Sequence, residues 1–289
     1  QLMLMHQDEF KTIGPIGVFD SGYGGLTILR QMQKLLPQYD YLYLGDNARA
    51  PYGSHSFEVI YEYTLQAVEA LFQMGCPLVI LACNTASAKA LRSIQQNDLH
   101  RLDPTRRVLG VIRPTVETVC GITQSKHVGV LATVGTVKSE SYNMELRKLY
   151  PEIQVTGQAC PIWVPLVENF EYDSPGADYF VEKRINEILE KDPEIDTLIL
   201  GCTHYPLLLH KIEKYVPQGV KIVSQGEYVS EKLADYLLRH PEMEQRLSKG
   251  GRVQYLTTES ADKFRESARL FMNDTELSAE RISLPFTEK

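Results

Sequence analysis

Two stretches of similar design decide the fold of this chain: Leu78-Val79-Ile80-Leu81-Ala82-Cys83-Asn84-Thr85 and Thr197-Leu198-Ile199-Leu200-Gly201-Cys202-Thr203-His204. Each is a short apolar run that ends in a cysteine, and small polar side chains follow the cysteine at once. Such a run predicts a buried strand of a parallel sheet. The ends of these strands face the ligand in an open α/β sheet. The two cysteines therefore predict two opposed acid–base groups facing one substrate.

Strand and helix patterns alternate over the rest of the chain. Apolar runs predict strands at residues 16–20, 39–44, 78–82, 108–112, 128–132, 153–156, 198–201, 221–224 and 253–257. Apolar residues at helical spacing predict helices at residues 26–36, 56–74, 138–149, 163–169, 176–190, 227–239 and 261–272, with another directly after Cys83. This βαβ rhythm predicts parallel sheets with right-handed crossovers.

The layout occurs twice. Asp20 opens a glycine-containing turn 63 residues before Cys83, and Thr133 opens another 69 residues before Cys202. We interpret this as an internal duplication: an α/β fold of two similar doubly wound lobes with mainly parallel sheets and the active site in the cleft between them. The expected limits are residues 14–112 plus 224–289 for the first lobe, 113–223 for the second, and 1–13 for a loose N-terminal extension. The first lobe carries Asp20 and Cys83, and the second carries Thr133, Glu168, Cys202 and His204.

The composition excludes several classes of protein. The 289 residues are 43% hydrophobic and 23% charged, which is ordinary for a soluble globular protein. A net charge of −7 without a basic stripe argues against nucleic-acid binding. No apolar run approaches the length of a membrane span. Five cysteines without a CxxC pair indicate reduced thiols in a cytoplasmic protein.

The cysteines differ in their surroundings. Cys76 and Cys120 lie on helix patterns and Cys160 on a connecting segment, so we interpret these three as structural. A single buried cysteine at a strand end is usually an inert small hydrophobe. Cys83 and Cys202 stand in matched contexts beside polar residues, and this match favours a functional role for both.

Asp20 heads the turn Asp20-Ser21-Gly22-Tyr23-Gly24-Gly25, which joins a strand to a helix. An acidic residue at the head of the turn would repel a phosphate. The carboxylate suits an ammonium group or a nearby thiol better, and capping of the helix is the structural alternative.

Three kinds of chemistry are open at this point. Cys202, His204, Cys83 and Asp20 could bind a metal, although zinc sites usually show closer pairs such as CxxC. Cys202 and His204 could form a nucleophilic pair, which leaves the second thiol without a role. Proton transfer at a carbon uses both thiols, because inverting a stereocentre without a cofactor needs a base on one face and an acid on the other.

In the third case Asp20 would accept or relay a proton at Cys83, and His204 would do so at Cys202. Small polar side chains at strand ends and helix starts would hold the ammonium and carboxylate groups of an amino acid, although each alone also fits a cap or turn. These side chains are Ser21, Asn84, Thr85, Thr133, Thr136 and Thr203.

Six ungapped motifs in order resemble the glutamate racemases of the aspartate/glutamate racemase superfamily. They cover most of the chain, from about residue 16 to residue 223. The motifs are Gly17-Val18-Phe19-Asp20-Ser21-Gly22-Tyr23-Gly24-Gly25, Pro51-Tyr52-Gly53, Ala82-Cys83-Asn84-Thr85-Ala86-Ser87, Thr133-Val134-Gly135-Thr136, Pro165-Leu166-Val167-Glu168 and Gly201-Cys202-Thr203-His204-Tyr205-Pro206-Leu207-Leu208.

The resemblance implies a cofactor-independent isomerase that interconverts L- and D-glutamate and supplies D-glutamate for bacterial peptidoglycan. It implies that Cys83 and Cys202 transfer the proton, with Asp20 beside the first thiol and with Glu168 and His204 at the second. It also implies a homodimer, no metal, a first lobe completed by the C-terminal segment and, in some relatives, activation by a peptidoglycan precursor. The positions that match the family's substrate contacts are Asp20, Ser21, Tyr52, Gly53, Asn84, Thr85, Thr133, Thr136, Thr203 and His204.

The chain departs from the family pattern at three places. His55 stands near a frequent basic position, and Arg113 is unexpected at the lobe crossing. Ser224-Gln225-Gly226 replaces a stretch that often resembles Asp-Ser-Gly.

Other functions remain as alternatives. Racemisation of aspartate would need a shorter pocket, and that of a hydantoin a less charged one. A two-lobed amino-acid sensor with inert thiols would show no exchange of the α-proton. A metal-dependent hydrolase using Cys202, His204 and Asp20 would lose activity with a chelator.

Overall fold

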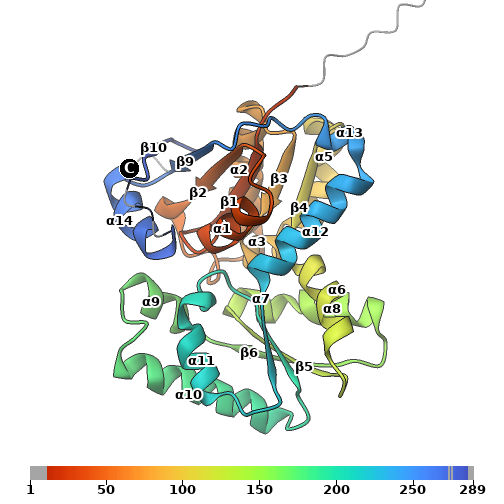
Figure 1. Ribbon diagram of the computed structural model, residues 1–289, viewed down its shortest axis with the longest axis vertical. Coiled ribbons are helices and arrows are strands. Elements are labelled where there is room, and N and C mark those ends of the chain that lie inside the picture. The colour runs from red at the N-terminus through yellow and green to blue at the C-terminus, as the bar shows by residue number, and fades with distance from the viewer. Residues whose placement is uncertain (1–11, 273, 275, 286–289) are drawn as a thin grey trace, which may run out of the picture.

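The computed structural model describes residues 12–285 except 273 and 275, so most of the expected N-terminal extension lies outside the described residues. Its strands form two sheets, one in each half of the molecule (Figure 1). The strands are β1 (Ile16–Asp20), β2 (Tyr41–Gly45), β3 (Leu78–Leu81), β4 (Arg107–Gly110), β5 (His127–Ala132), β6 (Gln154–Ala159), β7 (Thr197–Leu200), β8 (Lys221–Ser224), β9 (Val253–Thr257) and β10 (Ala279–Arg281).

Helices connect these strands. The α-helices are α1 (Leu26–Leu35), α2 (Phe57–Gln73), α3 (Asn84–Lys89), α4 (Leu91–Ser93), α5 (Leu99–Leu102), α6 (Ile112–Ile122), α7 (Val134–Ser139), α8 (Ser141–Leu149), α9 (Trp163–Glu168), α10 (Pro175–Lys191), α11 (Leu209–Tyr215), α12 (Gln225–Arg239), α13 (Pro241–Glu244) and α14 (Ala261–Met272). Short segments of other helix types are η1 (Asn47–Arg49), η2 (Ile94–Asp98) and η3 (Tyr205–Leu208). None of the helices in the described residues is long and apolar enough to span a membrane.

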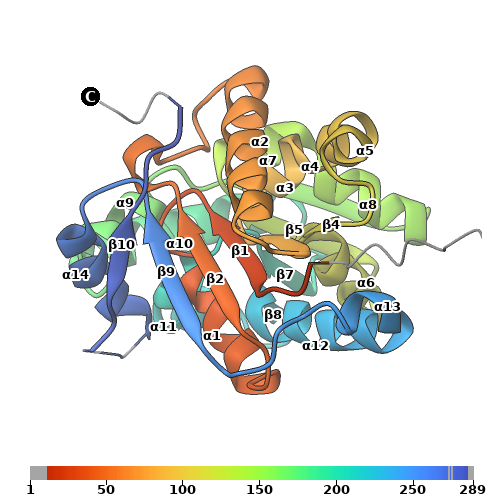
Figure 2. The same ribbon diagram turned by 90° about the horizontal axis from the view of Figure 1, so that it is seen from above.

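The two sheets repeat one topology. The first has the strand order β10-β9-β2-β1-β3-β4 and the second has the order β6-β5-β7-β8, and all the pairings are parallel. The order β2-β1-β3-β4 thus corresponds to β6-β5-β7-β8, as the predicted duplication requires. The C-terminal segment adds β9 and β10 beside β2, where Figure 2 shows them side by side. The predicted fold class, two similar doubly wound α/β lobes, is confirmed.

Both faces of the first sheet are buried. In β1, Ile16 and Val18 belong to the core cluster that includes α1 and α12, whereas Phe19 belongs to a second cluster with α2. Successive residues of a strand point to opposite faces, so a strand covered on both sides must be apolar throughout. This is why the strands appear in the sequence as continuous apolar runs.

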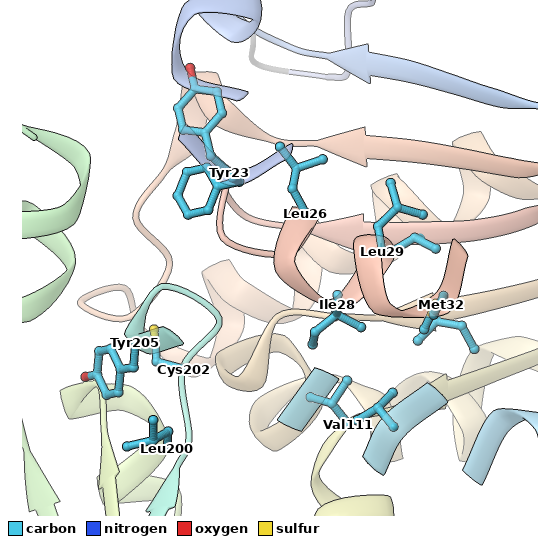
Figure 3. Packing of buried hydrophobic residues seen from close by; sticks show 14 of the residues in the cluster. Tyr23, Leu26, Ile28, Leu29, Met32, Val111, Leu200, Cys202 and Tyr205 are labelled. Atoms are coloured by element: carbon cyan, nitrogen blue, oxygen red, sulfur yellow. The ribbon is translucent and has the colours of Figure 1, made fainter. Parts of the chain in front are cut away.

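One core cluster connects the lobes. It contains Leu26, Ile28, Leu29 and Met32 on α1, and it continues to residues around β7, where Figure 3 shows Cys202 beside Leu200 and Tyr205. Helical spacing places these α1 side chains on one buried stripe. The lobes are therefore joined by apolar packing next to one of the two cysteines.

Three local predictions were wrong. The helix predicted at residues 138–149 is two helices, because Glu140 has a φ of 54° and breaks the hydrogen-bond ladder between α7 and α8. The strand predicted at residues 108–112 ends at Gly110, and the apolar residues beyond it form the buried face of α6. Cys76 lies in the turn between α2 and β3 and not on a helix.

Candidate active site

Cys83 and Cys202 occupy equivalent places in the two sheets. Cys83 follows β3, the neighbour of β1, and Cys202 lies just beyond β7, the neighbour of β5. In each sheet the strand order reverses between these two neighbours, which is where open α/β sheets bind ligands. Both cysteines line one small cavity of about 40 Å³. Its lining residues are Asp20, Ser21, Gly22, Ala50, Pro51, Tyr52, Gly53, Cys83, Asn84, Thr85, Thr133, Val164, Glu168, Cys202, Thr203 and His204.

The Cys83 side chain is buried on the first wall of the cavity. Its thiol lies 3.4 Å from Ser21 Oγ, to which it donates, and its sulfur accepts the Ala86 N–H at the start of α3. Burial raises the pKa of Cys83 to about 12, and the negative charge of Asp20 adds to the shift. The thiol of Cys83 is therefore protonated at neutral pH.

Asp20 lies behind this thiol at the end of β1. Its Oδ2 accepts the N–H of Gly25 at 2.6 Å, and Gly25, not Asp20, is the N-cap residue of α1. Burial raises the pKa of Asp20, while the positive charge of His204 and the N–H groups of Gly25, Ser21 and Gly22 oppose the shift. In the described part of the chain Asp20 has no hydrogen bond to Cys83, and the two groups interact through their charges.

The second wall carries a row of three groups. His204 Nδ1 lies 4.0 Å from Cys202 Sγ, and His204 Nε2 lies 2.9 Å from Glu168 Oε1. Burial alone would lower the pKa of His204, but its contacts with Cys202 and Glu168 outweigh burial and raise the pKa to about 10. The imidazole is therefore charged at neutral pH, and it connects the second thiol to a half-buried carboxylate.

Elements of the first lobe hold His204 in place. The ring of Phe271 on α14 meets the imidazole edge-on, with the ring centroids 5.8 Å apart. On the other side, a Cβ at Gly24 would overlap Thr203 Oγ1 and His204 Nδ1. Only glycine at position 24 therefore lets the first-lobe turn approach the second thiol's partner so closely.

Threonines from both lobes meet beside the thiols. Thr85 Oγ1 of the first lobe lies 3.1 Å from Thr133 Oγ1 and 3.4 Å from Thr136 Oγ1 of the second. Thr133 also caps α7 by accepting the Thr136 N–H. Thr136 was predicted to contact the substrate together with Thr85 and Thr133, but unlike these two it does not line the cavity. Thr203 lines the cavity, and its carbonyl accepts a hydrogen bond from the Thr27 hydroxyl.

Asp46 supports the loop that carries Tyr52 and Gly53, and the sequence analysis missed it. This buried carboxylate accepts hydrogen bonds from the Tyr52 hydroxyl, from Arg49 Nε at 2.7 Å and from Thr258 Oγ1 at 2.8 Å. The Tyr52 hydroxyl is therefore bound to the protein, while Tyr52 and Gly53 line the cavity. Asp46 could have been predicted from its position directly after β2. Asp20 was predicted in the same way, as a polar residue at the end of an apolar strand.

The residues expected for a metal site do not gather as ligands. Among the described residues, one group of at least three His, Cys, Asp or Glu side chains has ligand atoms within 4.8 Å of one another: His127, Asp192 and Glu194. This group is not part of the cavity lining. Its carboxylates lie against opposite ring nitrogens of His127, which is the arrangement of an ion pair. The cavity geometry therefore gives no support to the metal-dependent alternative.

Comparison with known proteins agrees with this geometry. A model of the family described as Asp/Glu/hydantoin racemase matches residues 16–229. The chain belongs to this family. It is 41% identical over 267 residues to the glutamate racemase of Ruegeria sp. (strain TM1040), covering 89% of this chain and 96% of that one.

Solved structures of family members are similar over nearly the whole chain. The crystal structure of glutamate racemase isoform RacE1 from Bacillus anthracis has a TM-score of 0.85 at 34% identity, covering 94% of this chain and 98% of that one. The glutamate racemase from Francisella tularensis, solved in complex with D-glutamate, has a TM-score of 0.82 at 31% identity, covering 93% and 97%. The chain is thus an isomerase, an amino-acid racemase, and the sensor and hydrolase alternatives lose their support.

Replacing Gly24 with alanine tests the close contact at His204. The added methyl group must displace Thr203 or His204, so we predict a loss of about 1–3 kcal/mol in the free energy of unfolding and a large fall in racemase activity. Gly121→Ala is the matched control, because a Cβ at this glycine meets no atom within 4 Å. Urea unfolding and activity assays of both variants check this, and wild-type behaviour of Gly24→Ala would contradict it.

Replacing Glu168 with glutamine tests the charge on His204. The contact with the Glu168 carboxylate helps to raise the pKa of His204, so its removal should lower this pKa. The alkaline limb of the pH–activity profile should then move to lower pH. Because the pKa of His204 in the folded protein is raised from its ordinary value of 6.5, protonation of His204 stabilises the fold. This stabilisation is fully present below pH 6.5 and is lost as the pH rises through about 10. The stability difference from wild type should therefore be larger at pH 6 than above pH 10. NMR titration of the His204 ring checks the shift, and an unchanged titration would contradict the role of Glu168.

Proposed function

We propose that the protein interconverts L- and D-glutamate by proton transfer at Cα between two thiols, without a cofactor. The observation that carries this proposal is the pair of cysteines, which end equivalent strands of two sheets and line one small cavity. Opposed acid–base groups are what inversion of a stereocentre requires. The product D-glutamate would serve peptidoglycan synthesis and so the building of the cell wall.

The two thiols start in different environments, and this sets the proposed sequence of events. The raised pKa of Cys83 keeps its proton in place, so this thiol is ready to donate to one face of Cα. In the same enzyme form Cys202 would remove the proton from the other face, with the His204 imidazolium 4.0 Å from its sulfur. After one turnover the proton lies on Cys202, and the opposite enantiomer is processed in the reverse direction.

Side chains around the thiols would hold the amino acid. We assign contacts with the ammonium and carboxylate groups to the predicted set, with Tyr52 and Gly53 contributing from their loop. Thr136 lies outside the cavity lining and would act through Thr85 and Thr133. The complex of the Francisella tularensis relative with D-glutamate supports glutamate over aspartate or a hydantoin. The predicted set is Asp20, Ser21, Tyr52, Gly53, Asn84, Thr85, Thr133, Thr136, Thr203 and His204.

Removing each thiol tests the two-base model. We predict that Cys83→Ala and Cys202→Ala each reduce racemisation at least about 10³-fold, because each removes one of the two proton-transfer groups. Each variant should still eliminate a leaving group from one enantiomer of a 3-substituted glutamate, and the two variants should prefer opposite enantiomers. Racemisation and elimination are followed by chiral chromatography.

Cys76→Ala is the control for these variants. Cys76 is also buried in the first lobe, but it packs in the core and does not line the cavity. It should retain racemisation even if its stability falls. A shared preference of Cys83→Ala and Cys202→Ala for one enantiomer would show that opposed bases are the wrong model.

We propose further properties of the protein from the same family resemblance. The lobe limits are those expected above, the protein works in the cytoplasm, and it acts as a homodimer.

A peptidoglycan precursor as activator would suit a second cavity of about 680 Å³ where the lobes meet, because five basic side chains line it beside two acidic ones. The basic residues are Arg92, Arg113, Lys148, Lys232 and Arg239, and the acidic residues are Glu117 and Glu145.

A further inference from the structure

Gln225 lies at the point where the chain leaves the second sheet. It is the first residue of α12 and follows β8 directly, and its side chain is buried. From there α12 runs along α1 of the first lobe, in the same core cluster. At Gly226 the helix comes so close to α1 that an added Cβ would lie 2.8 Å from Gln31 Cγ. The position of the Gln225 backbone is therefore fixed by β8 of the second lobe on one side and by the packing of α12 against α1 of the first lobe on the other.

The side-chain amide of Gln225 forms a reciprocal pair with that of Asn84. Gln225 Oε1 accepts a hydrogen bond from Asn84 Nδ2 at 2.7 Å, and Gln225 Nε2 donates to Asn84 Oδ1 at 3.0 Å. Two hydrogen bonds in opposite directions fix both the place and the orientation of an amide. Gln225 thus determines which way the Asn84 amide faces.

Three further groups belong to this buried network, and one of them is the Val111 carbonyl, 3.5 Å from Gln225 Nε2. The Tyr142 hydroxyl of α8 donates to Asn84 Oδ1 at 2.6 Å and lies 2.7 Å from Gln225 Nε2. Thr115 Oγ1 of α6 accepts from Gln225 Nε2 at 3.1 Å. Because these groups are buried and connected, removing Gln225 leaves Asn84 Nδ2 without the acceptor that it has in this network.

The network leaves one group of Asn84 for the cavity. Asn84 follows Cys83 directly and lines the cavity. Its Oδ1 already accepts two hydrogen bonds, and one Nδ2 hydrogen is given to Gln225, so the second Nδ2 hydrogen can be donated to a bound amino acid. We propose that Gln225 is a positioning residue for substrate binding, which holds the Asn84 amide so that it presents this N–H to a carboxylate of the substrate. The proposal rests on the proposed racemisation of glutamate.

The length of the side chain matters here. The pairing uses both polar atoms of the glutamine amide, and a serine at position 225 would be too short to pair with Asn84 in this way. The amide pair links the residue after the first thiol to the start of α12 and to α8 of the second lobe.

Replacing Gln225 with leucine tests the proposal, because leucine is of similar size but cannot pair with Asn84. We predict that KM for glutamate rises roughly tenfold or more while kcat stays within about threefold, since the lost contact binds substrate and transition state alike. Tyr142→Phe should act in the same direction with a smaller effect. Steady-state kinetics with L-glutamate and with D-glutamate measure the effects on KM and kcat separately.

Gln158→Leu is the matched control. Gln158 is a buried glutamine of the second sheet, but its amide pairs with Glu187 and Lys191 of α10 and does not line the cavity. Its loss should lower stability without changing KM. An unchanged KM in Gln225→Leu, or a loss confined to kcat, would overturn the positioning role.

A second readout separates this proposal from the proposed function. If the wild-type protein failed to racemise glutamate, the function would be wrong, and Gln225 would then be judged by NMR of the Asn84 side-chain amide, assigned with Asn84→Ala. The proposal predicts that the two Nδ2 proton signals shift in Gln225→Leu and stay in place in Gln158→Leu. Unshifted signals in Gln225→Leu would overturn it, whatever the substrate is.

Discussion

The burial of two thiols between two sheets is the constraint on which the rest of this structure depends. Removing water from Cys83 raises its pKa to about 12, and the same burial makes every nearby charge more effective. His204 stays charged because Glu168 and Cys202 outweigh the cost of burying an imidazolium. The two walls therefore offer a thiol that keeps its proton and a thiol beside a cation.

Maintaining this arrangement requires close packing across the lobes. Gly24 of the first lobe approaches His204 of the second, and the hydroxyl oxygens of Thr85 and Thr133, one from each lobe, lie 3.1 Å apart. The repeated strand order explains why matching residues of the two lobes meet. In each sheet the strand order reverses beside the strand that leads to the cysteine, and these two places lie at the same cavity. The duplication thus brings one cysteine from each lobe to the same cavity, and local differences make the surroundings of the two cysteines chemically unequal.

Much of this could be predicted from the sequence, because strands buried on both faces leave continuous apolar runs and polar residues mark their ends. That rule located Asp20, Cys83 and Cys202, and it would also have located Asp46. What it could not give was long-range pairing: the amide pair of Gln225 and Asn84 joins residues 141 positions apart. The break at Glu140 was missed for a different reason, because a single left-handed residue leaves the apolar spacing on both sides intact.

Hydrogen exchange at Cα during turnover tests the central claim most directly. Metal-free, cofactor-free protein is incubated with L-glutamate in D₂O, and optical rotation and α-deuterium are followed together. The two-thiol account predicts that rotation decays to zero and that the D-glutamate formed in the first turnovers carries deuterium at Cα. Racemisation with the original α-proton retained throughout, or bound glutamate with neither signal, would contradict it.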